Sequence, residues 1–202
     1  MSVKSRSRQA ENSAATRAAL LRIARKLFAE RGYAETATEE VVRRARVTRG
    51  ALYHHFRDKQ DLFEAVLDQV ETKLVAEVTA VASRERDPWS ALKSGCSAFL
   101  DACLDPAVQR IALIDAPAVL GWEKWREIDA KYFLSGVKAA LQAAMDQNLI
   151  PLQPVEPLAH VLSAALNEAS MLIAHAKDAE KARTEVSNVV ERLLEGVRAK
   201  GR

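Results

Sequence analysis

The sequence predicts an all-α protein, for three reasons. Only 7 of the 202 residues are glycine, and the abundant Ala, Leu and Val recur three and four residues apart, which is the spacing of one face of a helix. No segment shows the alternation of apolar and polar residues that marks a half-buried strand. The Asp-Pro pairs at 87–88 and 105–106 are typical helix starts, because Asp caps free N–H groups and Pro suits the first turn.

The first three predicted helices are short or closely spaced. Residues 14–31 are expected to form a helix that ends at Gly32, since glycine commonly terminates helices. Residues 37–45 form a second helix of about two turns. Thr36 and Glu39 fit a capping box at its start, in which Thr36 accepts from a free backbone N–H.

The segment Thr48–Lys59 is the most informative part of the chain. Leu52 and Phe56 are four residues apart and give a short helix an apolar back. The opposite face carries hydrogen-bonding and cationic groups around one glycine, which are Thr48, Arg49, Gly50, Tyr53 and His54. Two short helices joined by a turn of three or four residues make a helix-turn-helix. Such a front suits a helix that reads the major groove of DNA.

The remaining helices follow from caps, prolines and apolar stripes. Asp58 is expected to cap a fourth helix that reaches Ala82 and belongs to both parts of the chain. The later predicted helices are 88–104, 106–115, 122–147, 157–176 and 180–199. Pro117 is expected to end or kink the second of these, and three prolines mark the loop before the fourth. The predicted organisation is therefore a flexible basic arm (1–13), a helix-turn-helix domain (14–60) and a second helical domain (61–202).

The segment Thr16–Phe63 resembles the DNA-binding domain of TetR-family (TetR/AcrR) regulators. The residues that carry the resemblance are Ile23-Ala24, Leu27-Phe28, Arg31-Gly32-Tyr33, Thr36, Val41, Ala45, Val47-Thr48-Arg49-Gly50, Leu52-Tyr53-His54-His55-Phe56, Lys59 and Leu62-Phe63. One departure is Arg46, where the family usually has glycine in the turn. Arg46 either keeps a left-handed conformation, at a cost of about 1 kcal/mol, or changes the turn and reaches a phosphate.

The charge distribution agrees with a DNA-binding first part. Residues 1–59 contain 14 Lys and Arg against 6 Asp and Glu, a net charge of +8, whereas residues 60–202 contain 16 against 21, a net charge of −5. This asymmetry suggests that only the first part meets a polyanion. Basic helices that are merely solvated would give the same numbers.

The candidate DNA contacts follow from side-chain chemistry. Arg49 can bond guanine O6 and N7 together, and Thr48 can cap the reading helix and reach a base methyl or a phosphate. The groups expected to suit phosphates, or to allow close approach, are Thr38, Arg46, Gly50, Tyr53, His54 and Lys59. The arm, with Lys4, Arg6 and Arg8, is either an inert tail or a further DNA contact.

Two further sites are implied mainly by the resemblance. TetR-like regulators hold a small-molecule pocket in the second domain, and the candidate lining residues are Phe99, Cys103, Arg110, Ile111, Asp115, Trp122, Trp125, Phe133 and Asn167. They also form dimers, and the candidate interface residues on the last two helices are Leu162, Ala165, Ala169, Val186, Val190, Leu193, Leu194 and Val197. Ordinary core packing is the alternative explanation of both sets.

Other functional classes find little support. No zinc, phosphate-loop or nucleophile-elbow motif occurs, so no metal, cofactor or enzymatic activity is expected. Cys96 and Cys103 are expected to be reduced, buried residues. No apolar run is long enough to cross a membrane and no secretory signal is visible, so a cytoplasmic location is expected.

The resemblance implies a ligand-responsive transcriptional repressor. It would bind a palindromic double-stranded operator as a homodimer and be released by a small apolar or aromatic effector. Two alternatives stay open at this point. One is a ligand-independent or activating DNA-binding regulator, and the other is a helical enzyme or carrier that retains a helix-turn-helix.

Overall fold

A computed structural model describes residues 3–198, and its side chains from residue 11 onward. Within this range the chain contains helices and no strand. The helices are α1 (Val3–Arg31), α2 (Thr38–Ala45), α3 (Arg49–His55), α4 (Lys59–Ala82), α5 (Pro88–Ala102), the π-helix η1 (Val108–Asp115), α6 (Ala116–Leu120), α7 (Trp122–Asp129), the π-helix η2 (Ala130–Leu134), α8 (Ser135–Asp146), α9 (Val155–His175) and α10 (Ala179–Arg198). The all-α prediction is confirmed.

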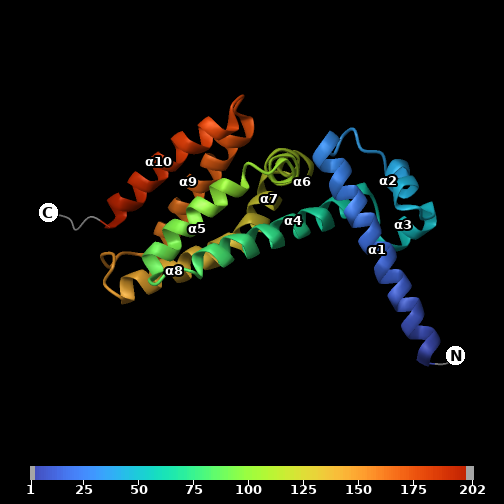
Figure 1. Cartoon of the computed structure of the whole chain (residues 1–202), viewed down its shortest axis with the longest axis horizontal. Coiled ribbons are helices and arrows are strands. Elements are labelled where there is room, and N and C mark those ends of the chain that lie inside the picture. Colours follow the sequence, from blue (N-terminus) through green and yellow to red (C-terminus); the bar gives the residue numbers. More distant parts are fainter. Residues whose placement is uncertain (1–2, 199–202) are drawn as a thin grey trace.

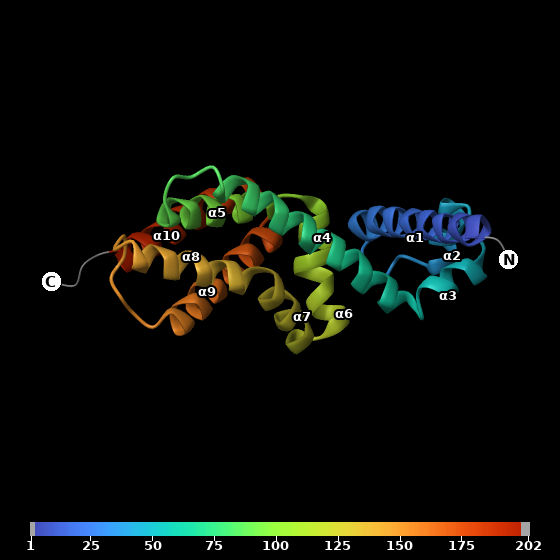
Figure 2. The same ribbon diagram turned by 90° about the horizontal axis from the view of Figure 1, so that it is seen from below.

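The molecule has two unequal parts joined by α4. Helices α1–α3 form a head at one end, and α5–α10 form a body at the other (Figure 1). Seen from below, α4 runs from beside α3 into the body, where it packs along α5 (Figure 2). One helix therefore contacts both parts, as the sequence predicts.

The first turns of α4 complete the core of the head. The Phe63 ring makes edge contacts with Phe28 at 5.3 Å and with Tyr33 at 5.1 Å between ring centroids. Leu62 and Phe63 are fully buried together with Leu20 and Leu27 of α1. Burying such large side chains stabilises the fold by about 1.5–3 kcal/mol each, so α4 and the head support each other.

Several helix starts agree with the caps read from the sequence. The Asp58 carboxylate accepts a hydrogen bond from the Asp61 N–H at 2.8 Å, and Asp87 accepts from Ser90 at 2.9 Å. These aspartates precede α4 and α5, whose bounds match the prediction within two residues. The part of the chain described contains no helix that is both long and apolar enough to span a membrane.

The prediction for the start of α1 was wrong, because the helix begins at Val3 rather than at Ala14. Residues 3–13 contain neither Gly nor Pro, and six of the eleven are Lys, Arg, Gln, Glu or Ala, which are good helix formers. The predicted flexible arm is thus helical from residue 3. The side chains of Lys4, Arg6 and Arg8 lie outside the described residues, so their proposed DNA contact stays a prediction.

The predicted capping box before α2 was also wrong. The Thr36 hydroxyl is buried and donates to the Gly32 carbonyl at 2.8 Å, so it satisfies the end of α1 instead of the start of α2. Gly32 has φ +82° and ends α1 in a left-handed conformation. Helix α2 starts at Thr38, after Ala37, with no side-chain cap.

Pro117 was predicted to end or to kink its helix, and it does not end it. A π-helical stretch, η1, precedes it, and the helix continues through α6 until Gly121, whose φ is +82°. A proline inside a regular α-helix clashes with the carbonyl four residues earlier, whereas Pro117 lies just after a π-helical stretch, whose hydrogen-bond pattern differs from that of an α-helix. The predicted helix 122–147 is observed as α7, η2 and α8 in succession.

Candidate functional site

The turn between α2 and α3 settles the question raised by Arg46. This residue has φ 56° and ψ 41°, and its N–H donates to the Arg43 carbonyl at 3.2 Å. The next N–H, of Val47, donates to the Val42 carbonyl at 3.2 Å. The turn therefore keeps the left-handed conformation that glycine favours, and the exposed Arg46 side chain is free to reach a phosphate.

We expect Arg46→Gly to raise the free energy of unfolding by about 1 kcal/mol, because it removes left-handed strain from a residue with a Cβ. Urea denaturation followed by circular dichroism measures this change. Arg46→Ala is the matched control, since it removes the same charge and keeps the strain. Equal stability of the Gly and Ala variants would show that position 46 carries no backbone strain.

Helix α3 is fixed at its start and at its back. The Thr48 hydroxyl accepts from the Ala51 N–H at 3.1 Å, as an N-cap does. Leu52 and Phe56 are buried against the head. Gly50 lies on the open side, where an added Cβ would meet no atom closer than 3.9 Å.

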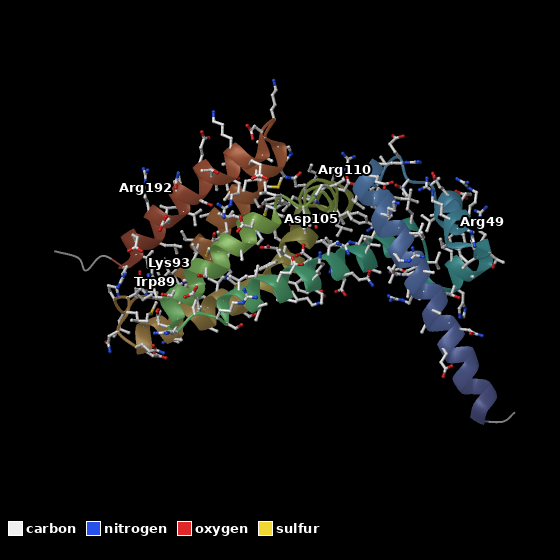
Figure 3. All side chains as sticks on the ribbon, in the orientation of Figure 1. Arg49, Trp89, Lys93, Asp105, Arg110 and Arg192 are labelled. Carbon is white, nitrogen blue, oxygen red and sulfur yellow. The ribbon has the colours of Figure 1, made fainter. Side chains whose placement is uncertain are left out.

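The solvent-facing side of α3 carries the predicted readers. Arg49 projects from the end of the molecule away from the body (Figure 3), and its guanidinium lies 5.6 Å from the centroid of the Tyr53 ring. An exposed ion pair of 3.8 Å also joins it to Glu39 of α2. His54 is exposed on the head as well, and Thr38, at the start of α2, is half-buried. Donors and a cation therefore gather on one face.

Lys59 is placed differently from the other candidates. Its ammonium donates to the Ala34 carbonyl at 3.3 Å and lies 4.2 Å from the centroid of the Tyr33 ring. Burial lowers the pKa of this amine. Lys59 thus connects the start of α4 to the turn after α1. A phosphate contact by Lys59 would therefore involve a side chain that already has partners within the protein. His55 is half-buried, and burial lowers its pKa, in agreement with a structural role.

The body contains a cavity of about 280 Å³ beside the far half of α4. Its walls come from α4, α5, α7, η2, α8 and α9, and they are mostly apolar. Phe99, Phe133 and Asn167, three of the predicted ligand residues, line it. The Phe99 and Phe133 rings meet edge-on at 5.3 Å.

Six predicted ligand residues do not line this cavity. Cys103, Ile111 and Trp125 are buried in the core, where the Trp125 indole donates to the Ala112 carbonyl at 2.9 Å. Trp122 is 58% exposed and packs on Trp125 at the surface. The remaining two are Arg110 and Asp115. The aromatic cluster in the sequence thus fills the core around η1 and α7, and only part of it reaches the cavity.

Arg110 and Asp115 join the body to the head. The Asp115 carboxylate accepts from the Tyr33 N–H at 2.6 Å and from the Arg110 guanidinium at 3.3 Å. Arg110 lies against Gly32, and a Cβ built there would be 2.0 Å from its Nη2 atom. Figure 3 shows Arg110 where the body meets α1. We call this contact the Gly32–Arg110–Asp115 latch.

Both cysteines are free and buried, as predicted. Burial raises the pKa of Cys96 and of Cys103 to about 12. At neutral pH these thiols are therefore protonated and unreactive.

The predicted dimer residues divide into two groups. Leu162, Ala169, Val190 and Leu194 are buried inside the protomer, so core packing already accounts for them, and their assignment to an interface with a second subunit stays a prediction. Ala165, Val186 and Val197 are half-buried at the border. The outer surface of α9 and α10 instead exposes Val161, Leu172, Val189 and Leu193, at 68%, 55%, 55% and 52%. We call these four residues the outer apolar face; of them, the prediction contained only Leu193.

The sequence contains signals for the missed residues. Val161 and Leu172 are eleven residues apart, as are residues on one face of a helix after three turns. The α4 wall of the cavity, which includes Val75, Val78 and Thr79, lies beside the α4 residues that contact α5. In both cases the apolar surface of the helix is wider than packing against a single neighbouring helix requires, and this width was the signal in the sequence.

Comparison with known proteins assigns the chain to a family. The family model described as Tetracyclin repressor-like, C-terminal domain, matches residues 89–197, and the one described as Bacterial regulatory proteins, tetR family, matches residues 20–66. The Transposon Tn10 TetC protein of Escherichia coli is 30% identical over 161 residues, which cover 80% of this chain and 81% of that protein. The regulator AcrR of Shigella flexneri is 38% identical over 79 residues, 39% of this chain and 37% of that protein.

Solved structures agree with these sequence relatives. A TetR-family transcriptional regulator from Pectobacterium atrosepticum is 33% identical, with a TM-score of 0.83 over 95% of this chain and 98% of that chain. RolR, solved in complex with the ligand resorcinol, has a TM-score of 0.70 over 95% and 97% of the two chains, but only 16% identity, and therefore shows the shared fold alone. The chain belongs to the TetR family of DNA-binding transcriptional regulators.

Proposed function

We propose that this regulator is a homodimeric repressor that binds a palindromic operator and is released by a small apolar or aromatic effector. The observation that carries the proposal is the cavity beside α4, because the same helix begins next to the reading helix α3. A ligand that alters the far half of α4 can therefore change the position of the head.

The outer apolar face supports the homodimer. Four large aliphatic side chains are more than half exposed on two adjacent helices at the end of the chain. Large apolar side chains exposed on neighbouring helices are typical of an interaction site. A second copy of the same face would cover it in a four-helix contact with two-fold symmetry.

Two-fold symmetry gives the operator its form. Each head would place α3 in a major groove, with Arg49 at base edges and Thr38, Arg46, Gly50, Tyr53 and His54 near the sugar-phosphate backbone. The dimer sets the distance between the two reading helices. The operator is therefore expected to contain two inverted half-sites one helical turn, or a multiple of it, apart.

Effector release requires that the ligand prefer the conformation that does not fit the operator. The cavity is mostly apolar and near the lower limit of small-molecule sites, which are roughly 300–1,000 Å³. RolR, a protein of the same fold, holds resorcinol, which is an aromatic ligand of modest size. An apolar or aromatic effector of similar size is the class that the cavity favours.

A footprint upstream of the neighbouring genes, followed by ligand titration, tests the proposal. Small aromatic compounds that raise the melting temperature of the protein are added to the footprinted complex. An effector is expected to weaken operator binding roughly 5- to 150-fold, and the operator must weaken effector binding by the same factor.

A cavity-filling variant, Val137→Phe, provides the control for this experiment, because Val137 lines the cavity and is remote from the head. It is expected to bind the operator normally and to lose the response. A variant that responds as the wild type does would place the effector elsewhere. A footprint that no bound compound changes would favour a ligand-independent regulator.

A further inference from the structure

Two carboxyl groups lie near one end of the mostly apolar cavity. They are Asp129, which is half-buried, and Glu71, which is buried, interacts with Asp129 and is not itself a lining residue. Asp129 lines the cavity directly. Glu71 is only 6% exposed and lies one helical turn before Val75, on the α4 stripe that continues along the wall through Val78 and Ala82. The spacings of four, three and four residues keep all four on one face of α4.

Neither carboxyl group has a cationic partner among the described residues. The Glu71 Oε2 atom is buried and accepts no hydrogen bond. Asp129 accepts one bond, from the Asn167 amide at 2.8 Å. Arg126 is exposed and interacts with Asp129 only at longer range. Besides Asp129, the titratable group beside Glu71 is the Cys103 thiol.

The burial of these two carboxyl groups has an electrostatic cost. Burial raises the pKa of Glu71 to about 8, and the charge of Asp129 contributes in the same direction. Burial also raises the pKa of Asp129, against the hydrogen bond from Asn167. A buried carboxylate without a partner costs several kcal/mol and tends to take up a proton instead. At neutral pH the pair therefore holds a proton, and a bound cation would compensate the charge that appears when that proton leaves.

We infer that the effector is an apolar or aromatic compound carrying one cationic amine, which lies at the Glu71–Asp129 end of the cavity. The inference rests on the proposed effector role of the cavity and names the class of ligand. The amine would meet the Asp129 carboxylate and the Asn167 amide oxygen or Glu71. The apolar part would lie along Phe99 and Phe133, whose ring faces also attract cations.

Three probes with the same apolar part and different head groups test the inference. They are 4-phenylbutylamine, 4-phenylbutanol and 4-phenylbutyrate, which are cationic, neutral and anionic at pH 7. Calorimetric titration of the full-length protein without DNA should give at least tenfold tighter binding of the amine than of the alcohol, and the weakest binding for the carboxylate. Alcohol binding as tight as amine binding, preference for the carboxylate, or failure of all three to bind at millimolar concentration would each overturn the inference.

Isosteric variants identify the groups responsible. Glu71→Gln and Asp129→Asn should reduce the preference for the amine over the alcohol at least fivefold, because each removes an ionisable carboxyl group and keeps the shape of the side chain. The matched control is Glu77→Gln, an exposed carboxylate farther along α4 that pairs with Lys73, and it should keep the preference. Retention of the preference in both cavity variants would show that the amine binds elsewhere.

Proton release provides a readout that does not depend on DNA. A cation beside Glu71 lowers its pKa from about 8, so amine binding at pH 7 should release close to one proton, whereas alcohol binding should release none. Calorimetry in buffers of different ionisation enthalpy counts these protons, and equal proton counts for the two compounds would contradict the inference. If the protein selects the amine but the amine does not change operator affinity, the effector role of the cavity is rejected and the cationic ligand class is kept. If the alcohol releases the operator as readily as the amine does, the cationic class is rejected and the effector role is kept.

Discussion

Leu193→Glu is expected to produce a folded monomer that has lost high-affinity operator binding. Leu193 belongs to the outer apolar face and is 52% exposed in the protomer, so the protomer tolerates a charge there. In a symmetric dimer the substitution buries two unpaired charges, at a cost on the order of 3–5 kcal/mol each. Light scattering measures the mass, and titration of a footprinted operator measures the affinity.

Two neighbouring substitutions separate assembly from folding. Asn188→Glu, on an exposed part of α10 away from the outer apolar face, should leave the dimer and its operator affinity intact. Leu194→Glu introduces a charge at a buried position and should unfold the protomer. A Leu193→Glu protein that remains a dimer with full operator affinity would place the subunit interface on another surface.

Arg49→Ala should remove sequence-specific binding and leave weak, salt-sensitive binding to any DNA. Each lost arginine–guanine contact costs about 1–3 kcal/mol of discrimination, and the proposed dimer would carry two copies of α3. The loss should be confined to particular base pairs in each half-site, and binding to a set of operator variants measures it.

Arg49→Lys is the matched variant, because it keeps the positive charge and loses the planar pair of donors. It should bind random DNA as the wild type does and still fail to select the operator. Equal weakening of operator and random DNA by Arg49→Ala would show that Arg49 contacts only phosphates.

Local chemistry made much of the fold predictable. Thr48, Asp58 and Asp87 cap the helices that follow them through bonds within three residues along the chain, so the sequence contains both partners of each bond. The same locality explains why α3 was placed with Leu52 and Phe56 inward. The prediction for Thr36 was wrong because its partner is the carbonyl of Gly32, which precedes it in the chain. The sequence pattern does not distinguish a threonine that bonds to the preceding helix from one that caps the following helix.

Packing between segments that are distant in the sequence could not be predicted from local patterns. Helices α9 and α10 each have two apolar surfaces, one toward the protomer core and one toward solvent, and the sequence does not say which is which. Val190 and Leu193 are three residues apart, yet one is buried and the other half exposed. For the cavity, aromatic content drew attention to Trp122 and Trp125, whereas the space lies beside Val75 and Asp129.

The Gly32–Arg110–Asp115 latch has a consequence for the exchange of heads between relatives. Asp115 holds the main-chain N–H of residue 33, so this bond survives any change of side chain at that position except proline. Arg110 instead occupies the space beside Gly32, so a head with any other residue at that point would clash with the guanidinium in its present position. A chimera that keeps this glycine retains both contacts with its new body. One that lacks it must displace the guanidinium and would join head to body through α4 and a weakened surface.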